Sequence, residues 1–345
     1  MTGAVRLESA TETSWRIEAR WRNLKLAVDS NSTDMLIAVR QGLSPWLQCE
    51  FVSDRCTAPT LTVQRLSLTG LDPLKMHGYQ EINASSGRVL YNPAESVMLT
   101  SAAPSEAGLY VRRLLRRTVV AALLAAGAGP IAAAAVGVSP HRAVAISGPS
   151  QSGKTSILLG LASKGYSFEL IANDTVYLDG SYMVGLPTVI ELRPEAIPLH
   201  LRPTIDEISL SSGETSPNRP ADGVRGRRVR VDPRNFCTAF GIGQRFESLG
   251  SEVIFLRPSA KQRHVSHVRL RTDECQDRID SLRLDESRQW LARNLSDAIP
   301  STKPGTTTQG VQGSVMAFNP AHLDVVVERI GIYISAQGYE TLREA

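Results

Sequence analysis

The stretch that decides the fold reads Arg142-Ala143-Val144-Ala145-Ile146-Ser147-Gly148-Pro149-Ser150-Gln151-Ser152-Gly153-Lys154-Thr155. Its first six residues are mostly small or apolar and predict a buried strand, and residues 154–163 predict a helix that ends at Gly165. The segment between them matches G-x-x-x-x-G-K-[ST] in full and stands in the strand, loop and helix context that this motif requires. The sequence therefore predicts a phosphate-binding P-loop.

Each residue type in this loop has a physical task. Glycines let backbone N–H groups approach phosphate oxygens, and the helix N-terminus adds partial positive charge. Lys154 is expected to neutralise the β- and γ-phosphates, and Thr155 to ligate Mg²⁺. We therefore expect ATP and Mg²⁺ as cofactors, with the choice between ATP and GTP left open. The expected nucleotide-binding residues are Gly148, Pro149, Ser150, Gln151, Ser152, Gly153, Lys154, Thr155 and Ser156.

A P-loop also needs a carboxylate that organises the metal, at the end of a second core strand. Asp174 follows the apolar run 168–172 and Asn173, and is the first candidate. Asp179 is instead assigned to turn chemistry, because Asp-Gly between two apolar runs is typical of a β-hairpin.

Composition places the chain among globular proteins. It has 345 residues, 42% hydrophobic and 21% charged, which is enough to bury a core and suggests about two domains. The net charge of +4 is too small to argue for a nucleic-acid partner. The four cysteines have no CxxC pair and the six histidines no HExxH spacing, so we expect a reducing cytoplasm and no zinc site.

No membrane segment is expected. The weakly charged stretch 119–138 is interrupted by Gly127, Gly129 and Pro130, which predicts a helix end followed by a buried strand rather than a membrane span. The first thirty residues are rich in charge and predict no secretory signal.

Three regions are expected along the chain. Residues 1–104 alternate short apolar runs with turns and predict a smaller α+β domain, with a helix at 33–41. Residues 105–128 predict a bridging helix, and residues 129–345 the P-loop domain. The arginine cluster of the helix is interpreted as a solvated face; it comprises Arg112, Arg113, Arg116 and Arg117.

The rest of the larger region predicts fewer elements. Residues 253–256 predict a core strand, 286–295 a helix, and 323–334 a strand or a helix. Residues 211–230 predict a long surface loop that is either ordered on binding or solvated. Its arginines are candidates for holding an anionic acceptor or the γ-phosphate; they are Arg219, Arg225, Arg227, Arg228 and Arg230.

From about residue 129 to 256 the chain resembles the HPr kinase/phosphorylase-like proteins, which are related in fold to phosphoenolpyruvate carboxykinase. The resemblance rests on the P-loop, on Lys164-Gly165-Tyr166, on Asn173-Asp174 and on Glu191-Leu192-Arg193. It implies an α/β fold with an HPr-kinase-like P-loop domain. It also implies that Glu191 assists the metal together with Thr155 and Asp174, and that Arg193 contacts the phosphates. The front region resembles HPr-kinase-like proteins that accompany biosynthetic genes.

The sequence departs from that family at three places. Asn173 stands where the family has an aspartate that manages the acceptor proton, Ala132 where many relatives have a histidine, and Pro194-Glu195-Ala196 where they are glycine-rich. Either Asp174 takes the proton, or positioning and charge activate the acceptor, because phosphoryl transfer has a loose transition state. The expected catalytic residues are Asp174, Lys154, Asn173 and Arg193.

The leading hypothesis is an ATP-dependent kinase whose acceptor is a hydroxyl, on Ser or Thr of a peptide or protein or on a small metabolite. The alternative is a nucleotide-binding regulatory or scaffold module with little or no kinase activity. An NTPase that couples hydrolysis to movement ranks last, and no nucleophile elbow supports a covalent hydrolase. Homo-oligomer formation is left open.

Overall fold

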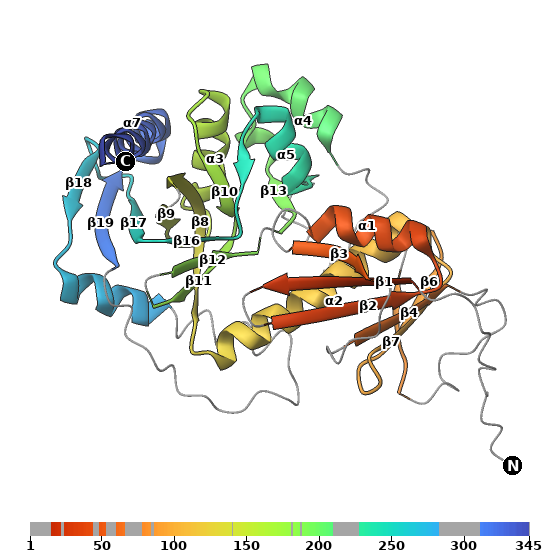
Figure 1. Cartoon of the computed structure of the whole chain (residues 1–345). Helices are drawn as coiled ribbons and strands as arrows, with labels where there is room; N and C mark the ends of the chain where they lie inside the picture. Colours follow the sequence, from red (N-terminus) through yellow and green to blue (C-terminus); the bar gives the residue numbers. More distant parts are fainter. Residues whose placement is uncertain are drawn as a thin grey trace, which may run out of the picture. The chain divides into compact units, whose positions relative to one another are not determined.

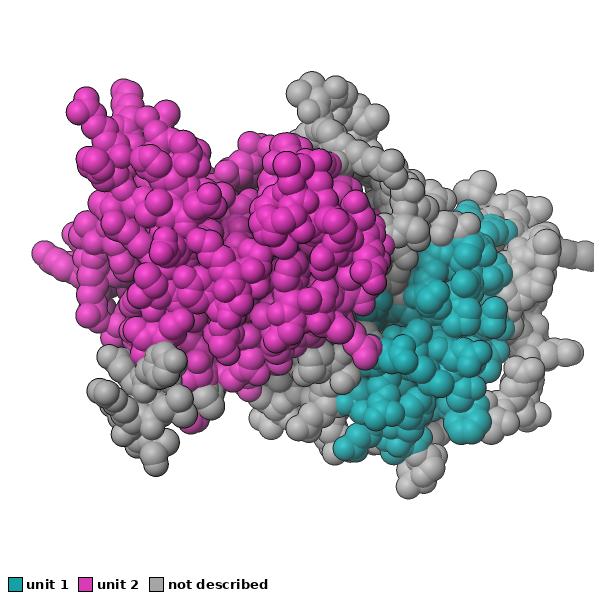
Figure 2. Space-filling model, turned by 90° about the horizontal axis from the view of Figure 1, so that it is seen from above, with its two compact units in different colours: residues 1–117, 213–217 teal, residues 118–212, 218–345 magenta. Residues whose placement is uncertain are grey.

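The computed structural model describes residues 15–21, 24–43, 48–52, 60–65, 78–83, 86–139, 141–180, 182–186, 188–209, 228–282 and 311–344. These form two compact units, one reaching Arg117 and the other beginning at Thr118 (Figure 2). Both units combine sheets with helices, so the fold is mixed α/β (Figure 1).

The first unit is built on a sheet whose strand order is β3-β1-β2-β4-β7-β6-β5. The strands are β1 (Trp15–Trp21), β2 (Leu24–Ser30), β3 (Gln48–Val52), β4 (Thr60–Arg65), β5 (Gln80–Asn83), β6 (Arg88–Asn92) and β7 (Val97–Thr100). Helix α1 (Thr33–Leu43) confirms the helix expected at 33–41 and buries Met35, Leu36 and Val39. Strand β5 pairs with β6 in antiparallel orientation.

Helix α2 (Pro104–Ala125) confirms the expected long helix, and the boundary between the two units falls within it. The helix stops before Gly127, whose φ of 87° favours glycine, and β8 (Gly129–Ser139) follows as a buried strand. Within its arginine cluster, Arg113 is exposed whereas Arg112 and Arg116 are half-buried. No helix among the described residues is long and apolar enough to cross a membrane.

The second unit is built on a larger sheet with the order β16-β12-β11-β8-β9-β17-β19-β18, in which β10 pairs with β8 and with β15. The strands after β8 are β9 (Arg142–Ser147), β10 (Glu169–Ala172), β11 (Thr175–Asp179), β12 (Tyr182–Gly185), β15 (Gly243–Gln244), β16 (Glu247–Leu249), β17 (Ser251–Pro258), β18 (Ser266–Arg269) and β19 (Gln312–Phe318). A separate pair joins β13 (Ile190–Leu192) to β14 (Val229–Val231).

The central strands of this sheet are buried on both faces, which explains their nearly continuous apolar sequences. In β9, Val144 and Ile146 belong to one core cluster, while Ala143 and Ala145 belong to the cluster on the other face. This alternation follows from the two-residue period of a strand. The first cluster includes side chains of α3 and α7, and the second includes Cys275 and Ile279 of the helix at 272–282.

Besides the helix at 272–282, this unit contains α3 (Lys154–Ser163), α4 (Arg202–Ile208), α5 (Pro233–Phe240), α7 (Leu323–Glu344) and the 3₁₀ turns η2 (Pro194–Ala196), η3 (Leu199–Leu201) and η5 (Pro320–His322). The alternative left open at 323–334 is thus decided in favour of a helix. The hairpin expected at Asp179 and Gly180 is confirmed by the pairing of β11 with β12. The strand expected at 253–256 is confirmed by β17.

One sequence expectation needs correction. The surface loop predicted for 211–230 is wrong at its C-terminal end, because residues 229–231 form β14, which pairs with β13. Pairing with β13 determines where the loop ends, since a segment of three residues is too short for its periodicity to predict a strand. Residues 211–227 of that loop, with Arg219, Arg225 and Arg227, lie outside the described residues, as does the helix expected at 286–295.

Candidate phosphate-binding site

The predicted P-loop follows the last residue of β9 and leads directly into α3. Gly153 caps the helix with a φ of 96°, a left-handed conformation that costs a glycine little. The first hydrogen bond of the helix runs from Ile157 N to Gly153 O at 2.8 Å. The N–H groups of the residues between them have no acceptor within the helix, so this end of α3 can bind an anion.

Gly148 is required by the space around it. A Cβ added there would lie 2.7 Å from Ser152 Oγ and 3.0 Å from Leu256 Cβ. Ser152 is only 3% exposed, and its hydroxyl oxygen has no hydrogen-bond partner in the described part of the chain. A close backbone turn with an unsatisfied buried hydroxyl at its inner side fits a loop that wraps phosphate oxygens.

Lys154 folds back over the loop that precedes it. Its Nζ donates hydrogen bonds to Gly148 O at 2.8 Å and to Pro149 O at 3.0 Å. These carbonyl oxygens have the same acceptor chemistry as phosphate oxygens, although they carry only partial charge. The remaining loop residues Pro149, Ser150 and Gln151 are exposed, and Thr155 and Ser156 are half-buried at the start of α3.

Asp174 lies at the same edge of the sheet as the P-loop. Ala133 of β8 pairs with Ser147 at the end of β9, and its N–H donates to Asp174 O at 2.9 Å. One strand therefore separates the two, and strand spacing places their backbones about 10 Å apart. The Asp174 side chain is exposed, and its carboxylate makes no hydrogen bond or ion pair with any described residue. It is available to a ligand.

Asn173 lies directly before it and has a different environment. It is 6% exposed, and its amide oxygen accepts a hydrogen bond from Thr188 N at 2.8 Å. Its Nδ2 donates to Thr188 Oγ1 at 3.1 Å and to Val189 O at 3.4 Å. These bonds tie the turn after β10 to the residues that precede β13.

Glu191 lies in β13, and Arg193 directly follows that strand, as expected. The Glu191 carboxylate is ion-paired with Arg228, whose Nη1 lies 2.8 Å from Oε2. Arg193 is half-buried, and within the described part of the chain its side chain makes no hydrogen bond or ion pair with the other expected site residues. Arg228 and β14 therefore lie beside Glu191. No local motif in the sequence indicates this proximity.

Two links thus connect the expected residues in the structure. The P-loop and Asp174 are connected across β8, and Asn173 connects Asp174 to the segment that leads to Glu191 and Arg193. The sequence reading missed Thr188, whose contact with Asn173 spans fifteen positions. Among the described residues, no group of three or more His, Cys, Asp or Glu side chains is arranged to hold a metal ion by itself.

Comparison with known proteins gives a limited result. No protein-family model and no curated protein matches the chain. Among solved structures, the chain is similar to the HPr(Ser) kinase/phosphatase from Coxiella burnetii, with 12% sequence identity and a TM-score of 0.27. The alignment covers 63% of this chain and 99% of that one.

Proposed function

We propose that this chain binds a nucleoside triphosphate, with ATP and Mg²⁺ as the expected pair, and transfers its γ-phosphoryl group to a hydroxyl. The acceptor hydroxyl belongs to Ser or Thr of a peptide or protein, or to a small metabolite. This is the activity that the sequence resemblance to HPr-kinase-like proteins implies.

A single observation carries the proposal: a complete G-x-x-x-x-G-K-[ST] loop links β9 to α3 in a conformation that only glycine permits at two positions. Gly148 has no room for a Cβ, and Gly153 adopts a left-handed backbone. The open N-terminus of α3 and the Lys154 ammonium supply the positive charge that a triphosphate needs.

The oxygen donors near the loop suit Mg²⁺, which prefers carboxylate, hydroxyl and phosphate oxygens. Thr155 would hold the ion from the loop and Asp174 from the far side of β8. When bound, Mg²⁺ would neutralise charge that develops on the phosphates. Opening of the ion pair between Glu191 and Arg228 would release a carboxylate oxygen toward the metal and let that arginine contact an anionic group.

The test uses γ-labelled ATP, Mg²⁺ and material from the native producer. Wild type is compared with Lys154→Ala and Asp174→Ala, and label is followed into acceptors. We expect transfer by wild type and its loss in both variants. In the absence of Mg²⁺, nucleotide binding should be weakened in Lys154→Ala and unchanged in Asp174→Ala. Nucleotide binding without transfer to any acceptor would reject the kinase.

That outcome would favour a second candidate, a nucleotide-binding regulatory or scaffold module. The observation behind it is that two expected site residues have partners within the protein. Asn173 is hydrogen-bonded to Thr188, and Glu191 is ion-paired with Arg228. In such a module the nucleotide would stabilise a binding conformation without being consumed.

A further inference from the structure

The side chain of Asn173 has its hydrogen-bonding groups engaged in both directions. Its Oδ1 accepts from Thr188 N at 2.8 Å, and its Nδ2 donates to Thr188 Oγ1 at 3.1 Å and to Val189 O at 3.4 Å. A backbone N–H can only donate and a carbonyl can only accept, so these partners fix the orientation of the amide.

The neutral amide satisfies both partners at once, whereas an ionised carboxylate cannot donate to the Val189 carbonyl. An ionised aspartate at this position would accept from Thr188 N, but it would turn its second oxygen toward the Val189 carbonyl with no proton between them. A buried carboxylate facing a carbonyl is unfavourable because neither group can donate. The asparagine is therefore specified by its protein partners.

The segment that Asn173 holds also passes close to β10. At Gly185, which ends β12, an added Cβ would lie 2.0 Å from Ile171 O, so the two backbones are in direct contact. Asn173 then holds the same segment three residues later, at Thr188, immediately before β13 begins at Ile190. These two contacts set the position of β13 relative to the turn that carries Asp174.

We propose that Asn173 is a positioning residue that holds the strand bearing Glu191 against the turn bearing Asp174, so that both carboxylates serve one Mg²⁺–nucleotide site. This inference rests on the proposed function, because it assumes that a nucleotide and Mg²⁺ bind at the P-loop. Residues that orient metal ligands from behind typically change metal affinity by about 10–100-fold when mutated. Such mutations leave unchanged the parts of the site that do not contact the metal.

The test measures how tightly the full chain binds a non-hydrolysable ATP analogue, by calorimetric titration, first in EDTA and then across a series of Mg²⁺ concentrations. Asn173→Ala removes the link without burying a charge, and Asn173→Asp introduces a carboxylate. In both variants we expect affinity in EDTA within about twofold of wild type. The Mg²⁺ concentration that gives half of the affinity increase should rise about tenfold.

The matched control is Asn92→Asp in the first unit. Asn92 is 4% exposed, and its side chain accepts from Ala94 N at 3.1 Å and Glu95 N at 3.3 Å. A carboxylate can accept both bonds, so the Mg²⁺ response should equal that of wild type.

Two results would overturn the proposal while leaving the proposed function intact. One is an unchanged Mg²⁺ response in Asn173→Ala. The other is a stronger response in Asn173→Asp, which would mean that position 173 faces the metal itself. Failure of wild type to bind the analogue, or to respond to Mg²⁺, would instead reject the proposed function and this inference with it.

Discussion

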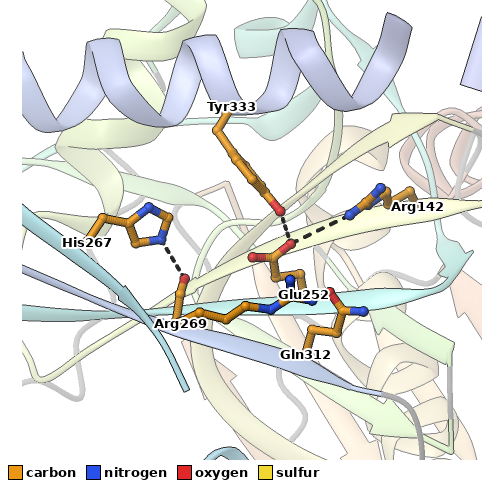
Figure 3. Close-up of polar contacts among 7 residues, drawn as sticks. Arg142, Glu252, His267, Arg269, Gln312 and Tyr333 are labelled. Atoms are coloured by element: carbon orange, nitrogen blue, oxygen red, sulfur yellow. Dashed lines mark hydrogen bonds and ion pairs between the residues drawn. The ribbon is translucent and has the colours of Figure 1, made fainter. Parts of the chain in front are cut away.

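The hydroxyl of Tyr333 in α7 donates a hydrogen bond to the buried carboxylate of Glu252 in β17 (Figure 3). Glu252 is 7% exposed, and Nη2 of Arg142 lies 3.9 Å from the same carboxylate oxygen. A carboxylate removed from water requires such partners. Arg142 is the first residue of β9, and the P-loop follows the last. The contact between Tyr333 and Glu252 therefore links α7 to the sheet near the end of β9 that is opposite the P-loop.

Replacing Tyr333 with Phe should lower the free energy of unfolding by about 1–3 kcal/mol, because the charged acceptor loses its donor. Urea denaturation measures this. Tyr166→Phe is the control. The ring of Tyr166 packs against Gly331, which lies in α7 as Tyr333 does, and the Tyr166 hydroxyl has no hydrogen-bond partner among the described residues. Equal losses in the two variants would show that the Glu252 contact does not stabilise α7.

The same tyrosine predicts a pH dependence. Burial, followed by the hydrogen bond from its hydroxyl to Glu252, raises the pKa of Tyr333 from 10.0 to about 12. The folded state therefore keeps this proton at pH values where the unfolded chain releases it. The stabilisation is fully present below pH 10 and is lost as the pH rises toward 12. Between pH 9 and 11, the difference in unfolding free energy between wild type and Tyr333→Phe should shrink; a constant difference would contradict the shift.

Gly331→Ala should destabilise the chain although alanine is the better helix former. An added Cβ would lie 2.2 Å from ring carbons of Tyr166, and such overpacking costs about 1–3 kcal/mol against about 1 kcal/mol gained in helix propensity. Thermal and urea unfolding give the net effect. On a Tyr166→Ala background the clash is absent, so Gly331→Ala should there be neutral or stabilising. If Gly331→Ala stabilised the otherwise wild-type chain, the close packing of Tyr166 against Gly331 would be contradicted.

Gly148→Ala should weaken nucleotide binding at least about tenfold, equivalent to about 1.4 kcal/mol, because the new methyl group would displace Ser152 or Leu256 and open the loop. Titration with a fluorescent ATP analogue measures the affinity. Gly137→Ala in β8 is the control, since the nearest atoms to its Cβ belong to the flexible Arg245 side chain, at 3.4 Å or more. Unchanged affinity in Gly148→Ala would contradict the assignment of this loop.

Much of the local structure could be predicted from sequence because the signals are short in range. The strand, loop and helix around Lys154 follow from an apolar run, a glycine-bearing motif and a helix stop at Gly165, and β9 and α3 confirm them. The hairpin at Asp179 and Gly180 follows from turn chemistry. The strand β14 could not be predicted, since only its pairing with β13 makes those three residues a strand.

The sequence by itself determined that a phosphate-binding loop stands between a buried strand and a helix, because glycine positions, lysine and apolar periodicity act within a few residues of one another. Only the tertiary structure decided what surrounds that loop. The route from Ser147 across β8 to Asp174, the bond from Asn173 to Thr188 and the ion pair of Glu191 with Arg228 join distant segments. Such contacts depend on strand order and register, which no local pattern encodes.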